Sequence, residues 1–147
     1  MSDYYDLFFT LELRPDLSEE VRYEIRYHFG LEPQPPARFR SLPDDGWYLD
    51  EPYPYFTGIA ASHAFPGADV AALVTQDDRT VLTVRQCIHD DELGWALELT
   101  QWLAEQSIAN GWIGFLGFSP DPDAPKTMYY EGGALAFSVP GPPTPRY

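Results

Sequence analysis

The order of strand and helix patterns constrains the fold of this chain more than any other feature. Apolar residues occupy every second position from Tyr5 to Leu13, which predicts a strand with one buried face. A helical pattern, two strand patterns joined by a hairpin signal, a second helical pattern and another strand pattern follow at residues 17–29, 70–76, 80–88, 90–107 and 112–118. This order is typical of a ferredoxin-like β-α-β-β-α-β unit.

We therefore predict an α+β fold built as a ferredoxin-like two-layer sandwich. Two helices would cover one face of an antiparallel sheet. Residues 134–139 would add an extra edge strand, and residues 56–65 carry a weak strand pattern. One domain would span residues 1–139, because a chain of 147 residues fits a single core, and residues 140–147 would form a Pro-rich tail.

The face of the first strand that points away from the helices carries Phe8, Thr10 and Glu12. In a two-layer fold this face is open unless another segment covers it. The hairpin would contribute one of two alternating sets, either Val81, Thr83, Arg85 and Cys87 or Leu82, Val84, Gln86 and Ile88. An apolar patch around an exposed Phe8 would indicate a homodimer or a ligand site. The alternative is that a long loop folds over it.

That loop covers residues 31–56. Six prolines between Pro33 and Pro54 exclude a continuous helix or central strand. The segment also carries too many aromatic residues for a free linker. We expect an ordered loop that packs against the domain, and long loops of this kind often serve a function.

Charge restricts the class of partner. With 23 acids against 9 bases, the formal net charge is −14, which favours basic proteins and disfavours nucleic acids and anionic membranes. No apolar run is long enough for a membrane helix, and the acidic N-terminus lacks a signal-peptide pattern, so we expect a cytoplasmic protein. Cys87 is the only cysteine, which excludes an intramolecular disulfide.

Three motifs have both a chemical and a structural interpretation. The run from His89 to Glu92 could hold a divalent metal, but acids are also favoured at a helix N-terminus. His63 could act as a base for a nucleophile, although no catalytic motif accompanies it. The glycines between Gly111 and Gly117 lack a phosphate-loop ending and suit close strand packing. We favour the structural interpretation in each case and predict no catalytic residue, metal or cofactor.

The most informative binding candidate is the base-free segment 41–56, where acids stand beside rings. Acids would steer a basic protein and fix its register, and rings would supply buried area. The alternative is that the rings close over the core while the acids stay in water. A pocket between this loop and the sheet is a second candidate. The residues of these two candidate sites are Asp44, Asp45, Trp47, Tyr48, Asp50, Glu51, Tyr53, Tyr55 and His63, of which Trp47, Tyr53, Tyr55 and His63 would line the pocket.

Three segments carry a resemblance to a group of proteins. Asp-Tyr-Tyr-Asp-Leu at 3–7, Arg-Tyr-His-Phe-Gly-Leu at 26–31 and Leu-Thr-Val-Arg-Gln at 82–86 resemble segments of small acidic proteins of actinobacterial type. The resemblance brings no known activity, so it implies no site residue.

The hypothesis that these features favour is a non-catalytic interaction module. It would bind a basic protein, as an inhibitor or an immunity-type factor does. The alternatives are a small-molecule-binding domain or minor enzyme, and a homodimer joined through the open sheet face.

Overall fold

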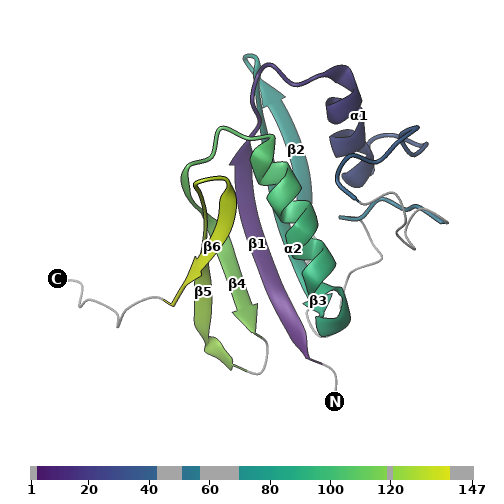
Figure 1. Cartoon of the computed structure of the whole chain (residues 1–147). Coiled ribbons are helices and arrows are strands. Elements are labelled where there is room, and N and C mark those ends of the chain that lie inside the picture. The colour runs from purple at the N-terminus through teal and green to yellow at the C-terminus, as the bar shows by residue number, and fades with distance from the viewer. Residues whose placement is uncertain (1–2, 43–50, 57–69, 119–120, 140–147) are drawn as a thin grey trace.

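The computed structural model describes residues 3–42, 51–56, 70–118 and 121–139 (Figure 1). Its elements are β1 (Tyr4–Glu12), α1 (Glu19–His28), β2 (Val70–Gln76), β3 (Arg79–His89), α2 (Asp90–Glu105), β4 (Gly111–Phe118), β5 (Asp121–Glu131) and β6 (Ala134–Ser138). All strand pairs are antiparallel, and the sheet order is β2-β3-β1-β4-β5-β6. The predicted α+β class with an antiparallel sheet and two helices is confirmed.

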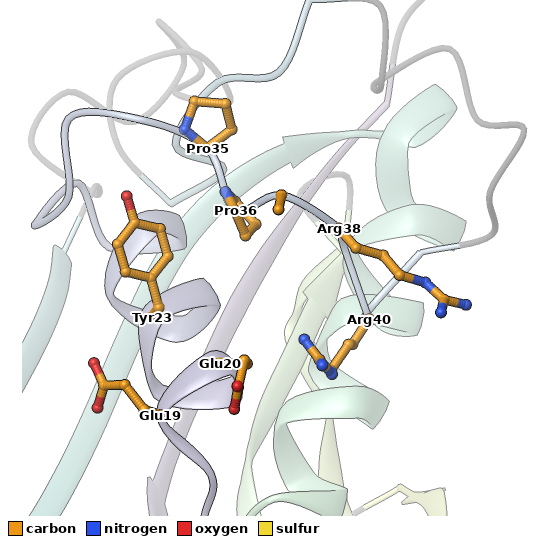
Figure 2. A pocket seen from close by; sticks show the side chains of 8 residues that line it. Glu19, Glu20, Tyr23, Pro35, Pro36, Arg38 and Arg40 are labelled. Atoms are coloured by element: carbon orange, nitrogen blue, oxygen red, sulfur yellow. The ribbon is translucent and has the colours of Figure 1, made fainter.

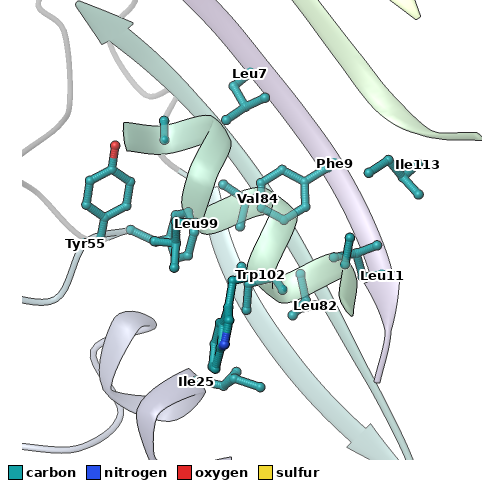
Figure 3. Packing of buried hydrophobic residues seen from close by; sticks show 14 of the residues in the cluster. Leu7, Phe9, Leu11, Ile25, Tyr55, Leu82, Val84, Leu99, Trp102 and Ile113 are labelled. Carbon is teal, nitrogen blue, oxygen red and sulfur yellow. The ribbon is translucent and has the colours of Figure 1, made fainter. Parts of the chain in front are cut away.

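The alternating pattern of β1 defines the two faces of the sheet. Leu7, Phe9 and Leu11 are buried, as predicted, and they belong to the same core cluster as Ile25 of α1 and Leu99 of α2. Figure 3 shows α2 lying across these strand residues, with Ile25 approaching Trp102 from the side of α1. Both helices therefore contribute to one core against one face of the sheet.

Local signals set the ends of both helices. The Ser18 hydroxyl accepts the Val21 N–H at 3.3 Å and caps α1, and Gly30, with φ of 75°, ends it. At α2, the imidazole Nδ1 of His89 accepts the Asp91 N–H at 3.1 Å. The acids after His89 therefore occupy a capped helix N-terminus, as the structural interpretation of that run predicts.

The sheet has one strand more than the sequence predicted, because β5 lies in a stretch between residues 118 and 134 for which we predicted no element. Pro122 and Pro125 hide its pattern. The structure places both prolines where the pairing with β4 shifts register, between Phe118 opposite Asp121 and Leu116 opposite Lys126. Pairing with β6 begins only at Thr127, so the proline-bearing half of β5 has a strand on one side only.

The Gln101 side chain of α2 holds the turn of the β5–β6 hairpin. Gly132 and Gly133 form its turn with φ of 60° and 82°. The Gln101 amide of α2 donates to the Gly133 carbonyl and accepts the Leu135 N–H, both at 2.9 Å. The predicted strand at 134–139 thus forms the sheet edge.

The described parts of the long loop, residues 31–42 and 51–56, contain no helix or strand. Phe56 is buried in a turn, whereas the rest of the weak strand pattern at 56–65 and the tail 140–147 lie outside the described residues. Among the described helices, none is long and apolar enough to cross a membrane.

Candidate functional site

The strand register defines the sheet face opposite the helices, which we call the open face. Phe8 lies opposite Arg85, Thr10 opposite Thr83 and Glu12 opposite Val81. The first of the two hairpin sets that the sequence left open therefore shares this face with Phe8. No helix of the described chain packs on it. Cys87, opposite Asp6 at one end of the face, is buried.

Three rings form a cluster on the open face, which we call the aromatic patch: Trp112 and Phe115 are exposed, and Phe8 is partly buried beside them. Phe8 and Phe115 are directly paired, with ring centroids 6.3 Å apart, and the rings of Trp112 and Phe115 meet edge to face at 5.7 Å. Trp112 is 49% exposed and Phe115 is 40% exposed. The described parts of the long loop leave the face uncovered at these two positions.

An irregularity in β4 brings the two exposed rings together. Trp112 and Phe115 are three residues apart and would lie on opposite faces of a regular strand. The pairing with β5 shifts between Trp112 and Gly114, and Ile113 is buried in the core. The shift returns Trp112 to the face of Phe115. Alternation along the sequence could not reveal this pair, because the bulge breaks the period of two.

Gly114 allows β4 to approach β1 closely beside the patch. A Cβ at this position would lie 1.8 Å from the carbonyl oxygen of Phe8. The structural interpretation of this glycine, as a site of close strand packing, is confirmed.

The charges of the open face that border the patch neutralise one another. The Arg85 guanidinium donates two hydrogen bonds to the Asp6 carboxylate, at 3.0 and 3.3 Å, and these bonds raise the pKa of Arg85. Arg79 of β3 pairs with Glu12 of β1 through a single carboxylate oxygen, Oε1. Between these pairs, the hydroxyls of Thr10 and Thr83 lie 3.1 Å apart. The aromatic patch therefore borders a strip of paired ions and hydroxyls.

The predicted loop site is described only at its end. Of its residues, the structure describes Glu51, Tyr53 and Tyr55. The others lie outside the described residues: Asp44, Asp45, Trp47, Tyr48, Asp50 and His63. Glu51 is exposed and Tyr53 is partly buried against the core. Tyr53 lies close enough to Tyr55 to contribute to the raised pKa of its hydroxyl.

Tyr55 is a core residue. Its ring contacts those of Phe56 and Trp95 at 5.3 and 5.5 Å, and burial, helped by the charge of Glu92, raises the pKa of its hydroxyl. The Gln86 amide donates to its carbonyl at 3.2 Å. Within the described chain, the alternative in which rings close over the core is the one that holds for Tyr55 (Figure 3).

A buried carboxylate anchors the other described end of the loop. Glu24 of α1 accepts the Arg40 N–H at 2.5 Å and the Ser41 N–H at 3.2 Å, and its Oε2 lies 3.1 Å from His28 Nε2. Burial alone would raise the pKa of Glu24. The hydrogen bonds from His28, Ser41 and Arg40 outweigh that effect, so the pKa lies below its ordinary value.

This cluster is not a catalytic relay. The Ser41 hydroxyl lies 3.3 Å from His28 Nε2, the same nitrogen that contacts Glu24. In a nucleophile-base-acid triad, the hydroxyl and the carboxylate bind opposite ring nitrogens. The His28 side chain is buried, and its Nε2 contacts both Glu24 and Ser41. Its role is to hold the loop.

Three candidate metal ligands converge more closely than the sequence predicted. One ligand atom from each of His89, Asp90 and Asp91 lies within 4.8 Å of the others. The His89 Nδ1 also accepts the Asp91 N–H, which accounts for the conformation by helix capping.

Comparison of the chain with protein-family models, curated proteins and solved structures finds no match.

Proposed function

We propose that this protein is a non-catalytic interaction module that binds a basic protein through the aromatic patch on its open face. The observation that supports this proposal most strongly is that the side chains of Trp112 and Phe115 are 49% and 40% exposed while their rings pack against each other. Exposed clusters of large rings favour contact with another protein, since aromatic residues are enriched at the centres of interfaces. The sheet holds the rings in place, so binding orders few side chains.

The chemistry of the partner follows from charge. The charged side chains near the patch form ion pairs with one another, Arg85 with Asp6 and Arg79 with Glu12. The rings are therefore the part of this surface whose burial against a partner would contribute most to the binding free energy. The net charge of −14 attracts basic proteins over long distances and repels nucleic acids, anionic membranes and a second copy of this chain. A role as an inhibitor or immunity-type factor for a basic protein suits such a surface.

The proposal extends to the topology. We propose that the first four strands and both helices form a ferredoxin-like unit to which β5 and β6 are added. The sheet order β4-β1-β3-β2 and the chain order of the helices support it. In such a unit the helices occupy one face, which leaves the other face for binding.

Affinity capture with matched variants tests the proposed function. The bait proteins are the wild type, the double variant Trp112→Ser/Phe115→Ser and the control Leu31→Ser, which removes a 57% exposed side chain after α1. We expect the wild type and the control to retain the same basic proteins at low salt and to release them at high salt. The double variant should not retain these proteins at either salt concentration. Equal capture by the double variant contradicts the proposal.

Sedimentation over a range of concentrations identifies the competing occupant. A dimer that the double variant abolishes would show that a second copy of this chain occupies the aromatic patch, as in the homodimer alternative.

A further inference from the structure

A groove on the opposite side of α1 from the core offers a binding site of a different kind. It lies between α1 and residues 35–40 and has a volume of about 480 Å³, within the range of roughly 300–1,000 Å³ that is typical of small-molecule sites. Figure 2 shows Glu20 and Tyr23 on the helix side, with Pro35, Pro36 and Arg40 on the loop side.

Hydrogen bonds and buried rings hold both walls of this groove in place. The Tyr23 hydroxyl donates to the Gln34 carbonyl at 2.8 Å, which ties the ring of the helix wall to the loop. Phe39 is buried between the exposed Arg38 and Arg40, with its ring 5.9 Å from that of Tyr27. The buried Glu24 holds the Arg40 N–H. A preformed site loses little conformational entropy on binding.

The groove is lined by two acids, Glu19 and Glu20, and by two bases, Arg38 and Arg40. Glu19 is engaged by Arg26 at 2.6 Å. Neither the Glu20 carboxylate nor the Arg40 guanidinium has an ion-pair partner among the described residues, although both line the groove. The rings of Tyr23, Pro35 and Pro36 line the same groove and give it an apolar surface beside Glu20 and Arg40 (Figure 2).

We propose that this groove binds a small zwitterion with a ring side chain, of the class of the aromatic amino acids. The ligand carboxylate meets the Arg40 guanidinium, which can bind both oxygens, and the ligand ammonium meets Glu20. The ligand ring packs on Tyr23 and the two prolines. This site is separate from the aromatic patch, so either proposal can fail without the other.

The test titrates L-phenylalanine into the full-length protein and follows backbone amide shifts by NMR. Two analogues separate the charges: 3-phenylpropionate lacks the ammonium and 2-phenylethylamine lacks the carboxylate. We expect saturable binding of L-phenylalanine with shifts at Tyr23 and Arg40, and binding about tenfold weaker in Arg40→Gln, because a charged hydrogen-bond pair is lost. Glu20→Gln should weaken L-phenylalanine binding but leave 3-phenylpropionate binding unchanged.

The side chains of Glu20 and Arg40 are exposed, so their replacement should leave the fold intact. Lys126→Gln is the matched control, because it also removes an exposed positive charge. Several results would overturn the proposal: no saturable shifts at millimolar L-phenylalanine, shifts confined to other parts of the chain, or equal binding by the Arg40 and Lys126 variants. Equal affinity for L-phenylalanine and both analogues would also overturn it, because the two charges would then contribute nothing.

Discussion

Replacing Glu24 by glutamine should destabilise the fold far more than an exposed substitution of the same kind. The carboxylate is fully buried and accepts two backbone N–H groups while contacting His28. The Gln amide keeps one oxygen and places an NH₂ group where an N–H donor now binds. We expect a loss of about 3 kcal/mol, since hydrogen bonds to charged groups contribute roughly 1.5–3 kcal/mol and breaking a buried pair costs about 3–5 kcal/mol.

Urea denaturation at pH 7 measures this loss, with Glu20→Gln as the control. Glu20 lies on the same helix, is exposed and has no ion-pair partner among the described residues, so its substitution should change stability by less than about 0.5 kcal/mol. If Glu24→Gln stays within that margin of the control, the proposed role of Glu24 as the anchor of the loop is wrong.

The same pair of variants gives a signed pH dependence. The native pKa of Glu24 is lowered despite burial, so the unfolded chain holds this proton more tightly than the folded one. The stabilisation that the ionised Glu24 carboxylate gives the fold is complete above its unfolded-state pKa of about 4.3. It is lost as the pH falls through the lower pKa of the folded state. The stability gap between wild type and Glu24→Gln should therefore narrow in acid. A gap that is constant or grows from pH 7 to acid would refute this reasoning.

Three further substitutions test the packing. Gly114→Ala should destabilise by several kcal/mol in urea denaturation, because its Cβ would lie 1.8 Å from the Phe8 carbonyl oxygen, and a change below about 1 kcal/mol would contradict that close approach. Gly94→Ala is the opposite case in α2, where a Cβ meets nothing within 4 Å, and it should stabilise by about 1 kcal/mol; a loss of stability would contradict it. Tyr55→Phe should be neutral or stabilising by thermal denaturation, because its buried hydroxyl has no hydrogen-bond partner among the described residues, and a loss above about 1 kcal/mol would reveal a partner.

The elements that the sequence predicted correctly are those whose signal is local. The run 70–76 became β2 without change of bounds, and the alternation from Tyr5 to Leu13 matches β1 with a shift of one residue at each end. Period and caps are properties of neighbouring residues, so one sequence suffices to recognise them. β5 was not predicted, because a strand accepts two prolines only where its N–H groups need no partner. That condition depends on the position of the strand in the sheet, which the sequence does not reveal.

The candidate sites depended on contacts between distant segments and were harder to predict. The aromatic patch needs a bulge that brings Trp112 beside Phe115 and a register that pairs Phe115 with Phe8. The anchor of the loop needs Glu24 to meet the N–H groups of Arg40 and Ser41, 16 and 17 residues away. Tyr55, chosen from its acidic surroundings in the sequence, lies in the core instead.

Photo-crosslinking from within the aromatic patch tests the proposed function most directly. A photoreactive phenylalanine analogue is placed at position 115 in one variant and at position 31 in another, since both sites are exposed. The cross-linked proteins from the host cell are then identified. The account predicts a basic protein joined to position 115, absent from position 31 and diminished at high salt. The same products from both positions, an acidic partner at position 115, or no product there would contradict it.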